Sequence, residues 1–252
     1  MKPLLVVFLL AVAAHGALTE KELESIGLRV WKNECAGTRE GLTSWNKGED
    51  FASLGIGHFI WYPEGGSGPF EESFPKLLAF FAANGVRLPS WISPSAHCPW
   101  RTRAEFQAEA QSPRAMELRE LLTTTIPLQC RFLAKRQEEA LPKMLEVAAP
   151  GERENVRRQY ARMSATGQGT FALIDYVNFK GEGVKDSERY HGEGWGLLQV
   201  LSAMRGEGGG APREFSAAAS AVLTQRVHNA PAERHEERWL GGWKSRVQAY
   251  AE

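Results

Sequence analysis

The chain has 252 residues, and its 30 Lys and Arg residues balance its 30 Asp and Glu residues, so the formal net charge at pH 7 is zero. A balanced charge produces no global field that would recruit nucleic acid or an anionic membrane surface. The length allows one large or two small domains with a sizeable core. We therefore expect no nucleic-acid partner.

The first sixteen residues, MKPLLVVFLLAVAAHG, have the layout of a secretory signal peptide. Lys2 supplies the positive charge, residues 4–14 form a short apolar run, and Ala14 and Gly16 are small residues at the positions that a signal peptidase reads. The run is too short for a membrane span. The sequence predicts a mature protein of residues 17–252 that is periplasmic or secreted and has no membrane span.

A helix is predicted directly after this segment. Thr19 and Glu22 have the spacing of a capping box, and apolar residues then recur at helical spacing from Leu23 to Trp31. Glu34 follows Leu23 by eleven residues, which is about 20° away on a helical wheel. The first helix should therefore carry a carboxylate at the C-terminal end of its apolar face.

A carboxyl in that position has a specific chemical use. Partial burial disfavours its charged form and raises its pKa, and a carboxylic acid that keeps its proton near neutral pH can protonate a leaving oxygen. Glu34 is thus a candidate general acid. Two plainer readings stay open: a buried acid paired with Arg or Lys, or an exposed residue at a frayed helix end.

Residues 51–62, FASLGIGHFIWY, are rich in strand-forming types and predict one or two short strands. Alternate strand residues share a face, so Ser53, Gly55 and Gly57 would line one side, with His58 turned to the core. Strand interiors usually avoid glycine. We expect a flat substrate to lie against the backbone at Gly55; a tight hairpin or crowding by another segment is the alternative.

The rest of the chain is mostly helical in pattern. A loop is expected over residues 63–69 and a flexible connector at GEGGG, residues 206–210. The predicted helices span residues 75–84, 102–124, 128–147, 151–163, 168–179, 195–205, 214–228 and 231–250. The expected fold class is α+β but mainly α, with a small β-hairpin near the N-terminus.

The segment from Glu34 to Ser53-Leu54-Gly55-Ile56-Gly57-His58 resembles the active-site region of phage-type lysozymes. In that family a catalytic Glu ends the first helix, and a hairpin follows with an Asp and then Thr-x-Gly-x-Gly-His. The resemblance implies a lysozyme-like fold, Glu34 as the acid, Ser53 as the group that holds the attacking water, and a structural His58.

The chain departs from that pattern at the second carboxylate. Without gaps, the position of the family's Asp falls on Lys47, and the acids nearby are Glu49 and Asp50. Strand alternation would put Glu49 on the same face as Ser53, so Glu49 is the preferred second catalytic carboxylate and Asp50 is the alternative.

A second segment carries a further resemblance. Gly196-Leu197-Leu198-Gln199-Val200 resembles the Gly-Leu-Met-Gln motif of lytic transglycosylases, which share the broader lysozyme-like fold. The alternative is an ordinary helix that starts after a Gly turn, which would have the same sequence pattern. Gln199 would then face a cleft or solvent. The candidate sugar contacts near the two motifs are Trp45, Asn178, Lys180, Glu182 and Trp195, and Glu182 is also a rival catalytic acid.

Two other sets of residues are expected to be structural. Trp239, Trp243, Val247 and Tyr250 recur every three or four residues, which predicts a core stripe rather than a substrate platform. The three cysteines, Cys35, Cys98 and Cys130, fit no metal-binding spacing. They predict either one disulfide with a spare thiol or three small buried thiols.

Together these features predict one lysozyme-like domain over residues 17–252, with a helical C-terminal extension. The predicted activity is that of an exported glycoside hydrolase or lytic transglycosylase acting on a β-1,4-linked amino-sugar polymer, peptidoglycan first and chitosan second, without metal or organic cofactor. The alternative is a non-catalytic glycan-binding or structural periplasmic protein. An enzyme should place Glu34 and a second acid across an open groove, whereas a structural protein should bury Glu34 against a cation.

Overall fold

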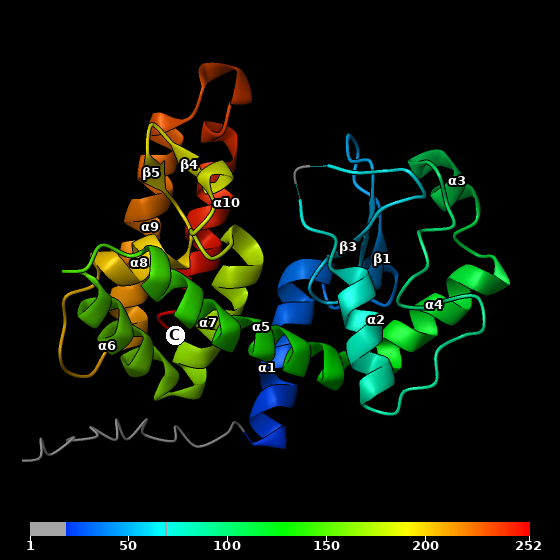
Figure 1. Ribbon diagram of the computed structural model, residues 1–252, viewed down its shortest axis with the longest axis horizontal. Coiled ribbons are helices and arrows are strands. Elements are labelled where there is room, and N and C mark those ends of the chain that lie inside the picture. Colours follow the sequence, from blue (N-terminus) through cyan, green and yellow to red (C-terminus); the bar gives the residue numbers. More distant parts are fainter. Residues whose placement is uncertain (1–18, 69) are drawn as a thin grey trace, which may run out of the picture.

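The computed structural model describes residues 19–68 and 70–252, and the predicted signal peptide lies outside them. Within the described residues the chain is mainly helical with a small antiparallel sheet near the N-terminus, as predicted (Figure 1). The helices are α1 Glu20–Cys35, α2 Phe74–Ala83, α3 Arg103–Ala108, α4 Pro113–Thr124, α5 Ile126–Val147, α6 Arg153–Ser164, α7 Gly167–Lys180, α8 Leu197–Ala203, α9 Ala211–Asn229 and α10 Glu237–Gln248. The strands are β1 Thr43–Ser44, β2 Ala52–Leu54, β3 Phe59–Trp61, β4 Arg189–Tyr190 and β5 Glu193–Gly194.

Most predicted helices are present within a few residues of their expected ends, and α1 begins with the expected capping box between Thr19 and Glu22. Two differ. The predicted helix 102–124 is divided into α3 and α4 because Ser112 caps a new helix whose first residue is Pro113. The last helix starts only at Glu237, after a short 3₁₀ turn.

Residues 51–62 form two short strands, β2 and β3, which is one of the two predicted arrangements. β2 pairs with β1 on one side and β3 on the other, and residues 55–58 form the turn between β2 and β3. Gly55 has a φ of 67° and His58 a φ of 46°. Strand alternation ends at Leu54, so the prediction that Ser53, Gly55 and Gly57 share one strand face is wrong.

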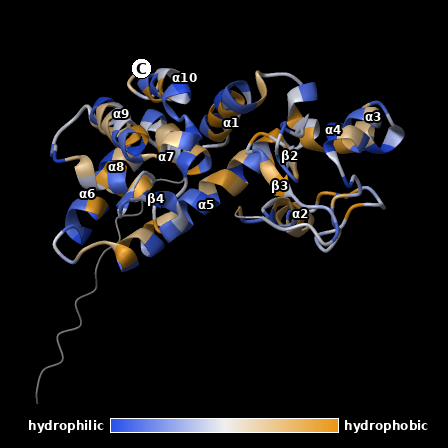
Figure 2. Ribbon diagram, turned by 90° about the horizontal axis from the view of Figure 1, so that it is seen from above, coloured by the Kyte–Doolittle hydropathy of each residue, from blue (hydrophilic) through white to orange (hydrophobic). Residues whose placement is uncertain are grey.

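The elements form two groups joined by helices. The three-stranded sheet lies with α2, α3 and α4, while α6 to α10 and the β4–β5 ribbon lie together on the other side, and α1 and α5 run between the groups (Figures 1 and 2). One hydrophobic cluster extends through both groups, from Leu42 and Trp61 near the sheet to Phe215 in α9. A single continuous core therefore fixes the two groups relative to each other.

The predicted C-terminal extension is packed into this core. Val247 and Tyr250 are fully buried, which confirms half of the predicted stripe. The prediction is wrong for Trp239, which is 40% exposed, because α10 turns that side to solvent; its ring instead stacks near Trp243, with centroids 6.0 Å apart. The last helix thus belongs to the body of the fold.

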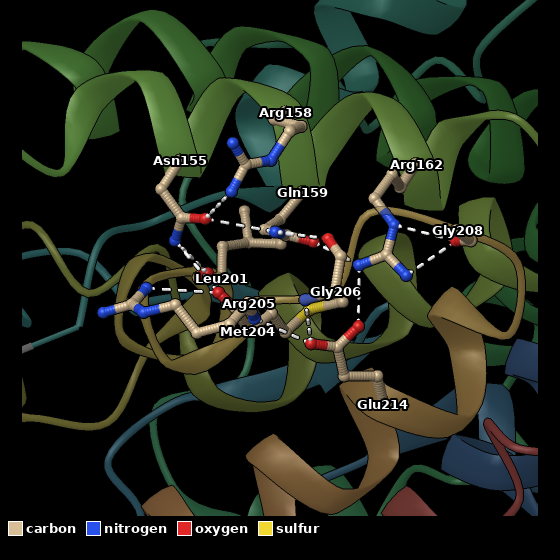
Figure 3. A network of polar contacts seen from close by, with 10 residues as sticks. All are labelled: Asn155, Arg158, Gln159, Arg162, Leu201, Met204, Arg205, Gly206, Gly208 and Glu214. Atoms are coloured by element: carbon tan, nitrogen blue, oxygen red, sulfur yellow. Dashed lines mark hydrogen bonds and ion pairs between the residues drawn. The ribbon is translucent and has the colours of Figure 1, made fainter.

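The GEGGG segment is a tied loop rather than a flexible connector. Arg162 of α6 donates to the Gly208 carbonyl at 2.8 and 3.1 Å and pairs with Glu214 of α9 at 2.6 Å, while Glu214 accepts from the Gly206 amide at 2.8 Å (Figure 3). A Cβ on Gly206 would collide with Arg162 and Glu214. The glycine at 206 therefore permits this close approach.

Cys35, Cys98 and Cys130 are buried free thiols, and burial raises the pKa of each to about 12. Their role is in packing, which was one of the two predicted readings. Within residues 19–68 and 70–252, no helix combines the length and apolar character that crossing a membrane requires.

Candidate functional site

A cavity of about 480 Å³ lies where the two groups of elements face each other. It is large enough for a small ligand or part of a polymer. Aromatic rings and charged groups alternate in its wall. The residues that line it are Gly57, His58, Ile60, Phe70, Glu71, Ser73, Arg136, Val177, Asn178, Phe179, Lys180, Gly181, Lys185, Ser187, Glu188, Tyr190, Trp195, Arg226 and Arg234.

Glu34, in the last turn of α1, does not line this cavity but contacts residues that do. Its side chain is 10% exposed, and its Oε1 accepts hydrogen bonds from Asn178 Nδ2 at 3.3 Å and from Arg246 Nη2. Its Oε2 lies 3.4 Å from Nδ1 of His58. Because Asn178 and His58 both line the cavity, the carboxylate is one side chain removed from its interior.

Arg246 connects Glu34 to a second carboxylate that lies deeper. Asp175 has no exposed surface, and it accepts from Arg246 Nε at 2.8 Å and Nη2 at 2.9 Å and from the Tyr250 hydroxyl at 2.5 Å. Burial alone would lower the pKa of the Arg246 guanidinium, but the charges of Asp175 and Glu34 outweigh it and raise that pKa. Arg246 therefore stays charged between the two acids.

Asp175 and Arg246 were not predicted from the sequence, and Tyr250 was predicted only as a core residue. One signal was available: Asp175 interrupts the apolar run FALIDYV of α7, and a carboxylate inside a buried helix needs a partner. The identity of that partner could not be read from the sequence, since Arg246 is 71 residues away.

His58 was predicted to point away from the site, and this is wrong. It belongs to the turn that replaces the expected strand, so alternation does not govern its direction. Its ring lines the cavity and approaches Glu34. His58 is therefore a candidate functional residue.

Glu49 and Ser53 contact each other, but the structure does not bring either of them to Glu34. Glu49 Oε2 accepts from Asn46 Nδ2 at 3.1 Å and from the Ser53 hydroxyl at 3.4 Å. Ser53 is 3% exposed within the sheet, and neither residue lines the cavity. Asp50 is exposed and is not part of the wall either. The expected pairing of Glu34 with a second acid from this segment is absent.

Trp45 was a candidate for stacking on sugar, but it is buried near Glu49. Its indole nitrogen donates to the Glu49 carbonyl at 2.7 Å, and its ring packs 5.9 Å from that of Phe106. Trp45 faces a different cavity of about 310 Å³, next to α3 and α4. Trp45 therefore lies beside the first motif, as predicted, but it does not line the cavity near Glu34.

Gly55 is buried and begins the turn between β2 and β3. Its φ of 67° disfavours any side chain, and a Cβ there would collide with the Gln129 amide oxygen. That oxygen accepts from the Ile56 amide at 2.9 Å, so Gln129 holds the turn from α5. Crowding explains the glycine, and the expectation that substrate lies against Gly55 is wrong.

Only some of the candidate residues in the second predicted segment line the cavity. Asn178, Lys180 and Trp195 line the cavity, and the Trp195 ring lies 4.0 Å from the Arg226 guanidinium carbon. Gln199 does not line it: its side chain donates to the Gly183 carbonyl at 3.1 Å and accepts from the Gly196 amide at 3.0 Å, which secures the loop.

Glu182, the rival acid, is also outside the cavity wall. Its carboxylate forms an ion pair with Lys143 of α5 at 2.8 Å. Glu34 does not line the cavity either, but it contacts two residues that do, His58 and Asn178, which favours it over Glu182 as the acid near the cavity.

Asn178 and Arg246 hold one oxygen of Glu34, and the other oxygen faces His58 on the cavity side. A held carboxyl near a polar cavity is compatible with a general acid or base, whereas its burial against Arg246 without a second acid is the arrangement predicted for a structural protein. The chain matches no protein-family model, no curated protein and no solved structure.

Proposed function

We propose that this chain is an exported enzyme that cleaves β-1,4-linked amino-sugar polymers, as a glycoside hydrolase or lytic transglycosylase on a lysozyme-like fold. Peptidoglycan is the first candidate substrate and chitosan the second. The observation that carries the proposal is the position of Glu34 at the end of α1, in contact with His58 and Asn178, which line a polar, partly aromatic cavity. Aromatic rings such as Tyr190 and Trp195 suit the apolar faces of sugars.

In the proposed reaction Glu34 gives its proton to the glycosidic oxygen as the bond to the anomeric carbon breaks. The positive charge that develops on the sugar is then quenched by water, which gives hydrolysis, or by the sugar's own 6-hydroxyl, which gives an anhydro-sugar. In either route the attacking hydroxyl group loses a proton, and Glu34 can accept it. One positioned carboxyl is therefore enough for the transglycosylase route.

Hydrolysis commonly uses a second carboxylate. Glu49 is held away from the cavity by Asn46 and Ser53, so it is a poor candidate in this geometry. The acids that line the described cavity wall are Glu71 and Glu188. If the products are hydrolytic, these two residues are the ones to test as the second acid.

The test is digestion of purified peptidoglycan, with the products identified by mass spectrometry. Reducing ends indicate hydrolysis, and anhydro-sugars indicate transglycosylation. Glu34→Gln is expected to lower the rate by about 10²- to 10⁴-fold, the usual contribution of a general acid. Glu24→Gln, an exposed change on the same helix, should leave the rate unchanged. A normal rate for Glu34→Gln would remove Glu34 from the mechanism.

A second candidate is a protein that binds glycans without cutting them, or that is purely structural. The contact of the largely buried Glu34 with Arg246 favours it, because this is the pairing expected of a structural acid. Binding of glycan fragments without any cleavage, in both the native chain and Glu34→Gln, would support this candidate over the enzyme.

A further inference from the structure

We propose that the cavity contains a binding site for an oxyanion, a carboxylate or a phosphate, whose recognition groups are Arg136 of α5 and Lys180 at the end of α7. Both side chains line the cavity. They belong to different helices, α5 and α7, so a ligand bound between them would be held by two elements.

The charge of the cavity wall is strongly uneven. Five cationic and two acidic side chains line it, which gives a formal sum of 5 − 2 = +3 in a chain whose net charge is zero. The cations are Arg136, Lys180, Lys185, Arg226 and Arg234, and the acids are Glu71 and Glu188. Such a concentration of one sign inside a concave surface attracts anions.

Most of these cations already have a carboxylate partner. Arg226 and Arg234 share the buried Glu236, at 2.8 and 3.1 Å, and Lys185 lies 3.5 Å from Glu71. Each of these three cations therefore has a carboxylate partner in the protein, although Arg226 and Arg234 share one.

Arg136 and Lys180 differ, because among the described residues neither forms a hydrogen bond or an ion pair. Lys180 Nζ instead lies 3.3 Å from the ring centroid of Trp243 and 4.0 Å from that of Phe179. Burial lowers the pKa of Arg136, although the charges of Glu71 and Glu182 oppose the shift. A buried guanidinium without a hydrogen-bonded partner is costly, and an anion bound between Arg136 and Lys180 would pair with the guanidinium and favour the protonated form of Lys180.

The surroundings of Lys180 give this site a measurable signature. Burial first, and then the charge of Arg226, lowers its pKa to about 6; Glu236 opposes the shift and Arg246 adds to it. These are the charged groups that face it from α9, α10 and the turn before α10. A bound anion would favour the ammonium form, so binding near pH 7 should be accompanied by uptake of a proton.

The site also bears on the substrate of the proposed enzyme. A glycan that carries carboxylates would bring a counter-charge into the cavity, whereas the amines of chitosan would add to its positive charge. This preference rests on the proposed function, but the oxyanion site itself does not.

The experiment is calorimetric binding of four probes at millimolar concentrations: inorganic phosphate, N-acetylglucosamine, its 6-phosphate, and N-acetylmuramic acid. We expect an anionic sugar to bind at least about tenfold more tightly than the neutral one, the effect of one charge-assisted hydrogen bond. The comparison of the 6-phosphate with the carboxylate sugar identifies which oxyanion the site prefers.

The variants Arg136→Gln and Lys180→Met should each abolish most of this preference. Lys135→Gln is the matched control, because it removes a charge from the same helix at a side chain that is 58% exposed. Titration in buffers of different ionisation enthalpy should detect proton uptake in the native chain and not in Lys180→Met. Lys180→Met keeps the length of the side chain against two aromatic rings, so it is expected to fold, and melting curves check this.

Three outcomes would overturn the site: no binding of any anion, equal affinity for the neutral and anionic sugars, or a preference that persists in both variants. Anion binding that depends on Arg136 and Lys180, in a chain that cleaves no glycan, would support the site and reject only the proposed enzyme activity.

Discussion

Arg246→Met should destabilise the native state because it leaves two acids without their shared cation. Asp175 has no exposed surface and Glu34 is 10% exposed, and both depend on this guanidinium. Methionine can still pack on the Phe179 ring, whose centroid lies 4.2 Å from the guanidinium carbon. Breaking a buried pair from one side typically costs about 3–5 kcal/mol. For a chain of this size that corresponds to a fall in Tm of roughly 6–20 °C.

The measurement is urea unfolding of the native chain, Arg246→Met, Asp175→Asn and the double variant. The double variant should be less destabilised than the sum of the single variants, because removal of the Asp175 charge removes the need for a counter-ion. A loss below about 1 kcal/mol for Arg246→Met, or strictly additive effects, would refute the reasoning, since either result means that the pair contributes little to the native state.

Two other predictions concern the turn and the buried amine. Gly55→Ala should lower the free energy of unfolding by about 2–5 kcal/mol, because Gly55 has a left-handed backbone and a Cβ there collides with Gln129. Gly65→Ala, also at positive φ but in open space, should lower it by about 1–2 kcal/mol. Equal losses of the two variants in urea unfolding would contradict this. The folded state holds Lys180 deprotonated above about pH 6 while the unfolded state keeps its proton up to about 10.5. Stability should therefore rise by about 1.4 kcal/mol per pH unit across that window, and Lys180→Met should lack this rise; identical slopes in the two proteins would disprove the assignment.

Much of the helical fold could be predicted because its signals are local. Helical spacing of apolar residues, the capping box at Thr19 and the Gly-rich breaks lie within a few residues of the elements that they define. The missed features are also local, but they depend on competing signals. Pro113 can start a helix as well as end one, and residues 55–58 can continue a strand or turn, depending on whether Gln129 supports the turn from α5.

The site was predictable only in part, because its contacts are distant in sequence. Glu34, Asn178 and Trp195 were found from their residue types and motifs, and the structure brings the first two together at 3.3 Å. Arg246 reaches Glu34 across 212 residues, and no periodicity carries that information. The two expected partners of Glu34, Glu49 and Ser53, do lie on the same side as each other, but the position of their strand relative to α1 is a tertiary feature that strand alternation does not give.

Glu34 contacts side chains from both groups of elements, and the same two groups line the cavity. Asn178 and Arg246 hold Oε1 from the side of α7 and α10, while His58 approaches Oε2 from the turn beside the sheet. A relative shift of the two groups would change the 3.4 Å separation between Glu34 and His58. The cavity is lined from the same two sides, so a ligand that fills it contacts both groups. Occupation of the cavity and the placement of the carboxylate are therefore expected to depend on each other, because both are set by the same distance between the groups.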